Sequence, residues 1–168
     1  MNKIKIFIVG LGRIGKIHLT NLQAMDEVEI IGICDPTDEA KFFSNKAGFK
    51  FYQKDFTDIA SEVQADAIVI CSPTDTHANY VSLAAKKGLD VFCEKPLDLS
   101  LEKVKQVLKS VNESKIKLML GFNRRFDSEF QSVKEKIVNG NIGHIHTIKI
   151  TSRDPSPPPI NYIKNSGG

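Results

Sequence analysis

Three glycines near the N-terminus have the spacing of a phosphate-binding turn. Gly10, Gly12 and Gly15 form a GxGxxG pattern, and Asp35 follows Gly15 by 20 positions. In such a pattern the first glycine permits a tight turn, the second lets the backbone approach a phosphate, and the third lets a helix pack against a strand. The amides that begin the helix can bind an anion. Because an acid at this distance binds ribose hydroxyls, the pattern predicts a dinucleotide site.

The carboxylate of Asp35 favours NAD over NADP as the cofactor. A 2′-phosphate on the ribose would meet this negative charge, whereas free hydroxyls can donate hydrogen bonds to it. Arg13 and Ile14 lie between the second and third glycines, and we expect them to contact the cofactor as well. The alternative is that the glycines form an ordinary turn and that Asp35 only caps the helix after Pro36.

A parallel sheet covered by helices is the fold that would position these residues. Strands are predicted over residues 4–9, 28–34, 49–52, 67–71, 90–93 and 117–120. Helices are predicted over residues 14–25, 39–47, 56–63, 76–87 and 101–111. The apolar strands and the helical spacing between them predict a doubly wound (Rossmann) α/β fold. In this fold, ligands bind at the carboxyl ends of the strands.

The composition is that of a globular protein without an obvious nucleic-acid or membrane partner. Of the 168 residues, 41% are hydrophobic and 26% are charged, which is enough for one sizeable core. The net charge is only +3, and the lysines are scattered over predicted helix faces. The apolar stretches are too short to cross a bilayer, and the first ten residues lack the features of a signal peptide. We therefore expect a cytosolic protein.

Neither a disulfide framework nor a metal site is expected. Cys34, Cys71 and Cys93 are widely spaced near the ends of predicted strands, and we interpret them as small buried thiols. His144 and His146 are two positions apart on a predicted strand and so share a face. No carboxylate or cysteine close in the sequence completes a ligand set with them.

The pattern changes at Asn123, which marks the predicted start of a second domain. Residues 1–122 are expected to form the dinucleotide-binding domain, and 123–168 the beginning of an incomplete α+β domain. That part is predicted to contain a helix over 126–137, a strand over 143–153 and a proline-rich stretch over 155–159. A lone strand would have an unpaired edge, and such edges favour association.

Four segments carry a family resemblance. They read GLGRIG at 10–15, SPTDTH at 72–77, EKP at 94–96 and GFNRRFD at 121–127. In this order and spacing they resemble the family of glucose-fructose oxidoreductase, inositol dehydrogenase and MocA (Gfo/Idh/MocA). Residues 151–164 most resemble its inositol 2-dehydrogenase branch. The resemblance implies an NAD(P)-dependent oxidoreductase that oxidises a ring hydroxyl of a cyclitol or sugar, and it implies a homo-oligomer.

The resemblance gives a catalytic role to one lysine. It implies that Lys95 is hydrogen-bonded to the reacting hydroxyl, whose proton an amine could relay as the hydride departs. It also implies that Glu94 and Pro96 shape the loop around the nicotinamide, and the Lys95–Pro96 bond is a candidate for the cis isomer. The alternative is an exposed Lys95 paired with Glu94.

Other residues of these segments are expected beside the cofactor. Ser72, Pro73 and His77 would lie near its ribose and nicotinamide, although a packing role for His77 is an equal alternative. Asn123 corresponds to a family position that faces the cofactor or the substrate.

Charged residues after Asn123 have a different expected role. We expect Arg124, Arg125 and Asp127 to form a structural ion-pair cluster between the two domains.

The resemblance also implies two catalytic residues that the chain lacks. The family has a further aspartate and histidine, in a DxxxH arrangement, shortly after the position of Gly167 and Gly168, where this chain ends. General acid and base groups typically contribute about 10² to 10⁴ to a rate. Two hypotheses follow: a cyclitol or sugar dehydrogenase, or a truncated dinucleotide-binding module with weak catalysis.

Overall fold

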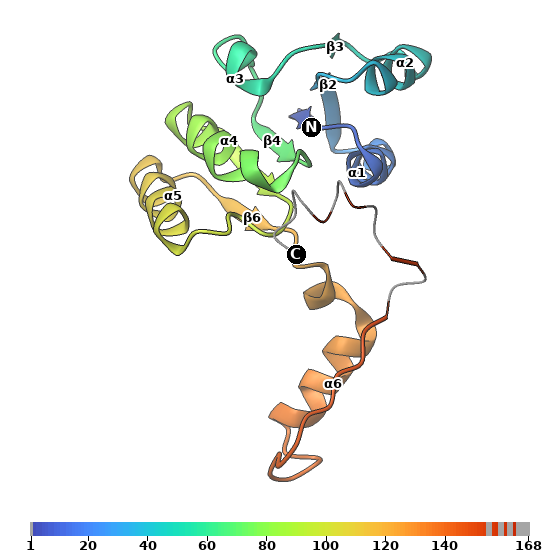
Figure 1. Cartoon of the computed structure of the whole chain (residues 1–168), viewed down its shortest axis with the longest axis vertical. Coiled ribbons are helices and arrows are strands. Elements are labelled where there is room, and N and C mark those ends of the chain that lie inside the picture. The colour runs from blue at the N-terminus through green and yellow to red at the C-terminus, as the bar shows by residue number, and fades with distance from the viewer. Residues whose placement is uncertain (1, 154–155, 158–159, 161–162, 164–168) are drawn as a thin grey trace.

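Six parallel strands form the frame of the protein (Figure 1). The computed structural model describes residues 2–153, 156–157, 160 and 163. Its strands are β1 Ile4–Val9, β2 Val28–Cys34, β3 Phe51–Tyr52, β4 Ala67–Ile70, β5 Asp90–Cys93 and β6 Leu118–Leu120. They form one six-stranded sheet in the order β3-β2-β1-β4-β5-β6. This order confirms the predicted doubly wound fold.

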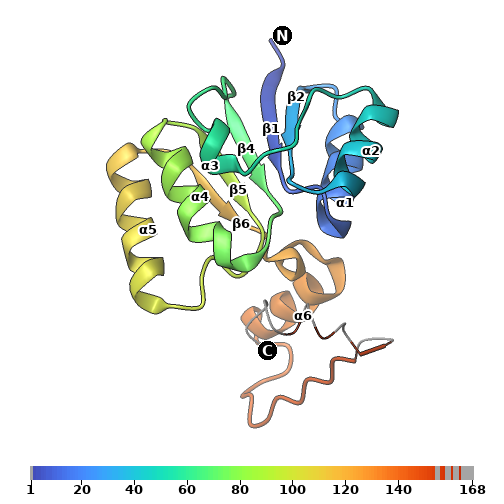
Figure 2. The same cartoon turned by 45° about the horizontal axis from the view of Figure 1, so that its top comes forward.

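Helices cover both faces of the sheet (Figure 2). They are α1 Arg13–Gln23, α2 Asp38–Ala47, α3 Phe56–Ile59, α4 Thr74–Lys86, α5 Leu101–Ser114 and α6 Ser128–Val138, with a 3₁₀ helix, η1, over Asn123–Phe126. The first two lie on one face of the sheet, and α3, α4 and α5 lie on the other. None of the helices in the described part of the chain is both long and apolar enough to span a membrane.

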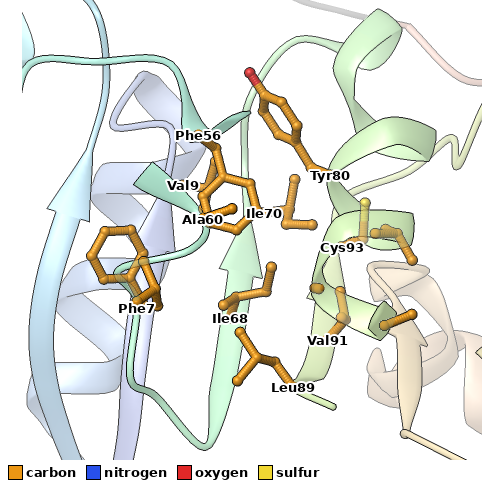
Figure 3. Packing of buried hydrophobic residues seen from close by; sticks show 14 of the residues in the cluster. Phe7, Val9, Phe56, Ala60, Ile68, Ile70, Tyr80, Leu89, Val91 and Cys93 are labelled. Carbon is orange, nitrogen blue, oxygen red and sulfur yellow. The ribbon is translucent and has the colours of Figure 1, made fainter. Parts of the chain in front are cut away.

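Alternate residues of β1 supply the cores on the two faces, because successive side chains of a strand point in opposite directions. Ile8 packs on the α1 side in a cluster that includes Leu19. Phe7 and Val9 pack on the α4 side in a cluster that includes Tyr80 (Figure 3). Burial of each large apolar side chain contributes about 1.5–3 kcal/mol to stability. This double burial explains why the strand has no polar face.

Most predicted elements have the expected place, with differences at their ends. β1, β2 and β5 have the predicted bounds, whereas α3 ends at Ile59 instead of residue 63. α4 begins at Thr74, two residues earlier than predicted. The preceding Pro73 has a φ of −59°, and proline favours such a start because its ring fixes a φ compatible with the helix.

The predicted strand over residues 143–153 is wrong. No strand or helix is assigned to these residues, which follow α6. A strand needs a neighbour to pair its N–H and C=O groups. Among the described residues, every strand belongs to the one sheet, which ends at β6. Of the predicted proline-rich stretch, only residues 156 and 157 are described.

The predicted helix over 126–137 is confirmed in part. Phe126 belongs to η1, and α6 begins two residues later at Ser128. α6 projects away from the sheet and its covering helices (Figures 1 and 2). Its apolar residues Phe130, Val133 and Ile137 are 44%, 58% and 37% exposed, so its apolar face is not covered by the described residues.

The buried hydroxyl of Ser44 lowers the free energy of unfolding. Ser44 of α2 is 0% exposed, and its Oγ has no hydrogen-bond partner among the described residues. An unpaired buried polar group costs about 1–3 kcal/mol. We therefore expect Ser44→Ala to raise the free energy of unfolding by about 1 kcal/mol in urea titrations.

Ser82→Ala is the matched control for this prediction. The hydroxyl of Ser82 donates to the carbonyl oxygen of Ala78 at 2.8 Å, so its removal should bring no gain. Equal stabilisation by both substitutions would contradict the explanation.

Candidate functional site

Two loops meet at the carboxyl edge of the sheet. β1 and β4 are neighbours, and the strand order reverses between them. Gly10 follows β1 and Ser72 comes shortly after β4, and a Cβ added to Gly10 would lie 2.6 Å from the amide nitrogen of Ser72. The loops are therefore in direct contact. Ligands of doubly wound folds bind at such a reversal point.

The loop after β1 tolerates no side chain at two of its glycines. Gly10 has a φ of +90°, a conformation that favours glycine. A Cβ on Gly15 would lie 2.2 Å from the carbonyl oxygen of Gly10. In contrast, a Cβ on Gly12 would meet nothing within 4 Å. The packing of the loop thus requires Gly10 and Gly15, while the space beside Gly12 is open to a ligand.

The N-terminus of α1 faces this space without a side-chain cap. Gly12 is the N-cap residue, and the first turn contains no acidic residue. The first amides of a helix lack partners within the helix, and its dipole favours an anion there. Arg13 is exposed at this end, and Ile14 is half-buried. The residues present therefore fit a phosphate or pyrophosphate group.

Asp35 fastens the glycine loop to the end of β2. Its side chain is 8% exposed, and Oδ2 accepts a hydrogen bond from the amide of Leu11 at 2.8 Å. Oδ1 accepts from the amide and the hydroxyl of Thr37 at 2.8 and 2.5 Å. Thr37, not Asp35, caps α2, so capping is not the role of Asp35 itself. A carboxylate has about four acceptor positions, so these three hydrogen bonds leave about one for a ribose hydroxyl.

His77 connects the loops that follow β4 and β5. It is 1% exposed, and its Nδ1 and Nε2 lie 2.7 and 2.9 Å from the carbonyl oxygens of Pro96 and Ser72. Its burial and these two contacts favour the packing alternative for its side chain. The hydroxyl of Ser72 lies 2.6 Å from that of Thr76, and Pro73 is exposed.

Lys95 lines a cavity of about 1000 Å³ with residues of η1 and α6. The cavity brings Lys95 and Asn123 together, two residues that the sequence predicts to lie near the substrate. The Lys95–Pro96 bond is cis, as predicted. The amide of Lys95 lies 3.3 Å from Oε2 of Glu94, whereas the described residues include no ion pair between the two side chains.

The predicted ion-pair cluster after Asn123 is wrong for the described residues. Asp127 instead caps α6, where its Oδ1 accepts from the amides of Glu129 and Phe130 at 3.0 and 3.2 Å. The guanidinium of Arg124 lies over the ring of Phe130, 4.9 Å from its centroid. Unpaired helix amides thus take the carboxylate that was expected to pair with Arg124 and Arg125.

A contact that the sequence did not predict joins α1 to the loop after β5. Nε2 of His18 lies 2.9 Å from Oε1 of Glu94, although the two residues are 76 positions apart. The one signal available in the sequence was the position of His18, three residues after Gly15 and so on the same side of the helix.

Three thiols lie near the carboxyl ends of β2, β4 and β5. Cys34, Cys71 and Cys93 are free thiols, and Cys34 and Cys93 are buried as predicted, whereas Cys71 is only half-buried. Burial, and then the charge of Asp35, raises the pKa of Cys34. Burial, and then the charge of Glu94, raises the pKa of Cys93 to about 12. These thiols are therefore protonated near neutral pH.

The predicted pair of histidines lies apart from this site. The rings of His144 and His146 have centroids 6.2 Å apart. In the described part of the chain, no group of three or more histidine, cysteine or acidic side chains could hold a metal ion.

Residues 4–122 match the family model described as an oxidoreductase family with an NAD-binding Rossmann fold, Gfo/Idh/MocA. The chain belongs to this family. The matched residues include the glycine loop, Asp35, the loop after β4 and Lys95.

Similar proteins in the family are inositol dehydrogenases. The chain is 42% identical over 166 residues to the inositol 2-dehydrogenase of Rhizobium meliloti, covering 98% of this chain and 50% of the relative. The same figures hold for the myo-inositol 2-dehydrogenase of Thermotoga maritima. The scyllo-inositol dehydrogenase of Lactobacillus casei, solved with NAD(H) and scyllo-inositol, is 32% identical with a TM-score of 0.79, over 84% of this chain and 43% of that one. The chain therefore spans about half the length of the curated relatives it matches.

Substitution of two glycines should separate packing of the loop from ligand binding. Gly15→Ala places a methyl group against the carbonyl of Gly10 and should lower the free energy of unfolding by more than about 1 kcal/mol. Gly12→Ala has open space and should change it by less than about 0.5 kcal/mol, while it weakens NAD binding. Urea unfolding and calorimetric titration with NAD measure the two effects. Equal destabilisation by both substitutions would contradict the assignment of the open space to a ligand.

Proposed function

We propose that the chain forms the NAD-binding half of a dehydrogenase that oxidises a ring hydroxyl of a cyclitol or sugar. The observation that carries the proposal is the alignment of three loops at one sheet edge, because β1, β4 and β5 are consecutive in the sheet. The first loop has the open space at Gly12, the second carries Ser72, and the third carries Lys95. A dinucleotide extended along this edge would reach from the glycine loop toward Lys95.

The acidic end of β2 supports NAD over NADP. Asp35 lies on the side of β1 opposite to β4, where the adenosine half of a dinucleotide binds in this fold. Its carboxylate can accept a hydrogen bond from a ribose hydroxyl at its remaining acceptor position, whereas a 2′-phosphate would be repelled. The hydrogen bond to Leu11 keeps this carboxylate against the glycine loop.

Lys95 supplies the group that moves a proton in this proposal. NAD, when bound, supplies the hydride acceptor. Oxidation of an alcohol releases a hydride from the carbinol carbon and a proton from its hydroxyl oxygen. The amine nitrogen Nζ of Lys95 accepts that proton in its neutral form and can return it to solvent, since Lys95 is exposed in the cavity.

A polyol is the substrate class that the cavity and the relatives support. The lining includes the amides of Asn123, Gln131 and Asn139, which can donate to hydroxyl oxygens and accept from hydroxyl groups. The Lactobacillus casei relative was solved with scyllo-inositol. Together these observations favour a cyclitol or a sugar.

The division of the chain is part of the same proposal. We assign residues 1–122 to the dinucleotide domain and 123–168 to the start of a second domain. The exposed apolar residues of α6 support this division, because such a face is normally covered by other parts of a protein. Assembly into a homo-oligomer and a cytosolic location complete the proposal, and the three free thiols suit a reducing compartment.

A weak dinucleotide-binding module is the second candidate function. It is favoured by the lining of the cavity beside Lys95, which among the described residues contains no histidine that could act as a second acid or base. The two candidates predict the same binding of NAD and differ in turnover.

Lys95→Ala tests the catalytic assignment. Calorimetry should detect NAD binding, and absorbance should detect NADH formation with myo-inositol. We expect the substitution to lower turnover at least about 100-fold and to leave the NAD affinity within a few-fold, because the amine acts on the hydroxyl and not on the cofactor. Lys103→Ala, which removes an exposed lysine paired with Asp98 at 3.7 Å, should change neither.

The outcomes separate the candidates. NAD binding without NADH formation by the unsubstituted chain would favour the weak module. Unchanged turnover in Lys95→Ala would remove Lys95 from the mechanism.

Asp35→Asn tests the choice of cofactor. We expect it to weaken NAD binding about tenfold and NADP binding less, since a hydrogen bond to a charged group contributes about 1.5–3 kcal/mol. Thr37→Val is the control, because it removes the hydrogen bond from the Thr37 hydroxyl to the same carboxylate and keeps the two amide hydrogen bonds and the charge. A matching loss of NAD affinity in Thr37→Val would show that Asp35 acts only through the loop.

A further inference from the structure

Glu94 joins two parts of the site that come from distant parts of the chain. It follows β5 directly, and its amide donates to the carbonyl oxygen of Ile70 at 2.9 Å. Oε1 of its carboxylate is held by His18 of α1 at 2.9 Å, and Oε2 lies 3.3 Å from the amide of Lys95. The carboxylate thus lies between the helix that follows the glycine loop and the backbone of Lys95.

Neighbouring residues restrict the position of the Glu94 carboxylate. A Cβ on Gly121 would lie 3.0 Å from Oε1 of Glu94, so any larger residue would press on the carboxylate. The ring of His18 packs edge-on against Phe92, with centroids 4.9 Å apart. The side chains of His18 and Glu94 are only 25% and 20% exposed. A fully exposed ion pair, in contrast, has a variable geometry and contributes little to stability.

The direction of the hydrogen bond follows from the chemistry of the pair. An ionised carboxylate only accepts, so Nε2 of His18 carries the proton and donates it to Oε1. Loss of the donor would leave a part-buried carboxylate without its strongest partner, and Glu94 would then turn toward water. The backbone at Lys95 would lose its contact with Oε2 in the same movement.

We propose that His18 is a positioning residue, which holds Glu94 so that the Lys95 loop keeps a fixed place relative to α1. The importance of that place for catalysis rests on the proposed function, because the start of α1 would bind the cofactor and Lys95 would act on the substrate. Reacting groups need alignment within a fraction of an ångström, so a contact that links the two elements has a direct effect on catalysis.

The test compares the Lys95 amide in three variants by ¹H–¹⁵N NMR on the full chain without NAD. In His18→Leu, the amide signal should shift and its hydrogen exchange should become about tenfold faster, because the contact with Glu94 is lost. His18→Gln retains an N–H donor near the position of Nε2 and should restore most of the protection. Lys16→Gln is the matched control on α1, because it breaks the 2.6 Å bond to Glu39 and the contact with the ring of Phe43 but leaves His18 and Glu94 unchanged. It should leave the Lys95 amide unchanged.

Two further measurements keep the proposal falsifiable if His18→Leu fails to fold. In the unsubstituted chain, the ¹⁵N spectrum of His18 should show a protonated Nε2, and a deprotonated Nε2 at neutral pH would overturn the proposal. Calorimetry should find the NAD affinity of His18→Gln within about threefold of the unsubstituted chain, since the pair lies outside the phosphate loop.

The failure of this inference differs from the failure of the proposed function. An unchanged Lys95 amide in His18→Leu, or a Lys95 amide that moves equally in Lys16→Gln, would overturn the positioning role while NAD binding stands. Absence of NAD binding by the unsubstituted chain would overturn the proposed function and leave the NMR result on Lys95 intact.

Discussion

The close approach of backbone to backbone at the carboxyl edge is the constraint on which the site depends. Gly10 contacts the backbone at Ser72, and Gly15 contacts the carbonyl of Gly10, with no room for a side chain at either glycine. These contacts place the start of α1 close to the end of β1. The unpaired amides of the first turn of α1 therefore lie at the carboxyl edge of the sheet. The open space beside Gly12 exists because its neighbours in the loop are packed so tightly. The anion binding that we propose therefore depends on backbone geometry more than on charged side chains.

Buried and half-buried polar side chains then fix the surrounding loops. Asp35 ties the glycine loop to β2, His77 ties the loops after β4 and β5, and Glu94 ties the last of these to α1. A buried polar group without partners is costly, so each of these side chains has a strong preference for one arrangement. The same preference makes the loops rigid supports for Lys95. Rigid supports are what a reaction that depends on alignment requires.

The region after β6 has a different character. α6 keeps its apolar residues exposed, and the cavity beside Lys95 is formed partly by this helix. The dinucleotide part thus has a complete core of its own, whereas the described part of the region from 123 onward has none.

The sequence by itself determined the elements whose information is local. Strand-like segments predicted β1, β2 and β5 with their observed ends, and the glycine spacing predicted the loop and its uncapped helix. Proline chemistry marked the Lys95–Pro96 bond as a candidate for the cis isomer. The tertiary structure decided what depends on residues far apart in the chain. The contact of His18 with Glu94 spans 76 positions, and no local pattern encodes it.

The errors have the same physical origin. The alternating pattern over 143–153 is that of a strand, but a strand exists only where a second strand pairs with its backbone. Asp127 has the charge to pair with an arginine, but the free amides of α6 lie closer to it. In both cases the sequence specifies what a residue can do, and the folded chain decides which of the available partners is within reach.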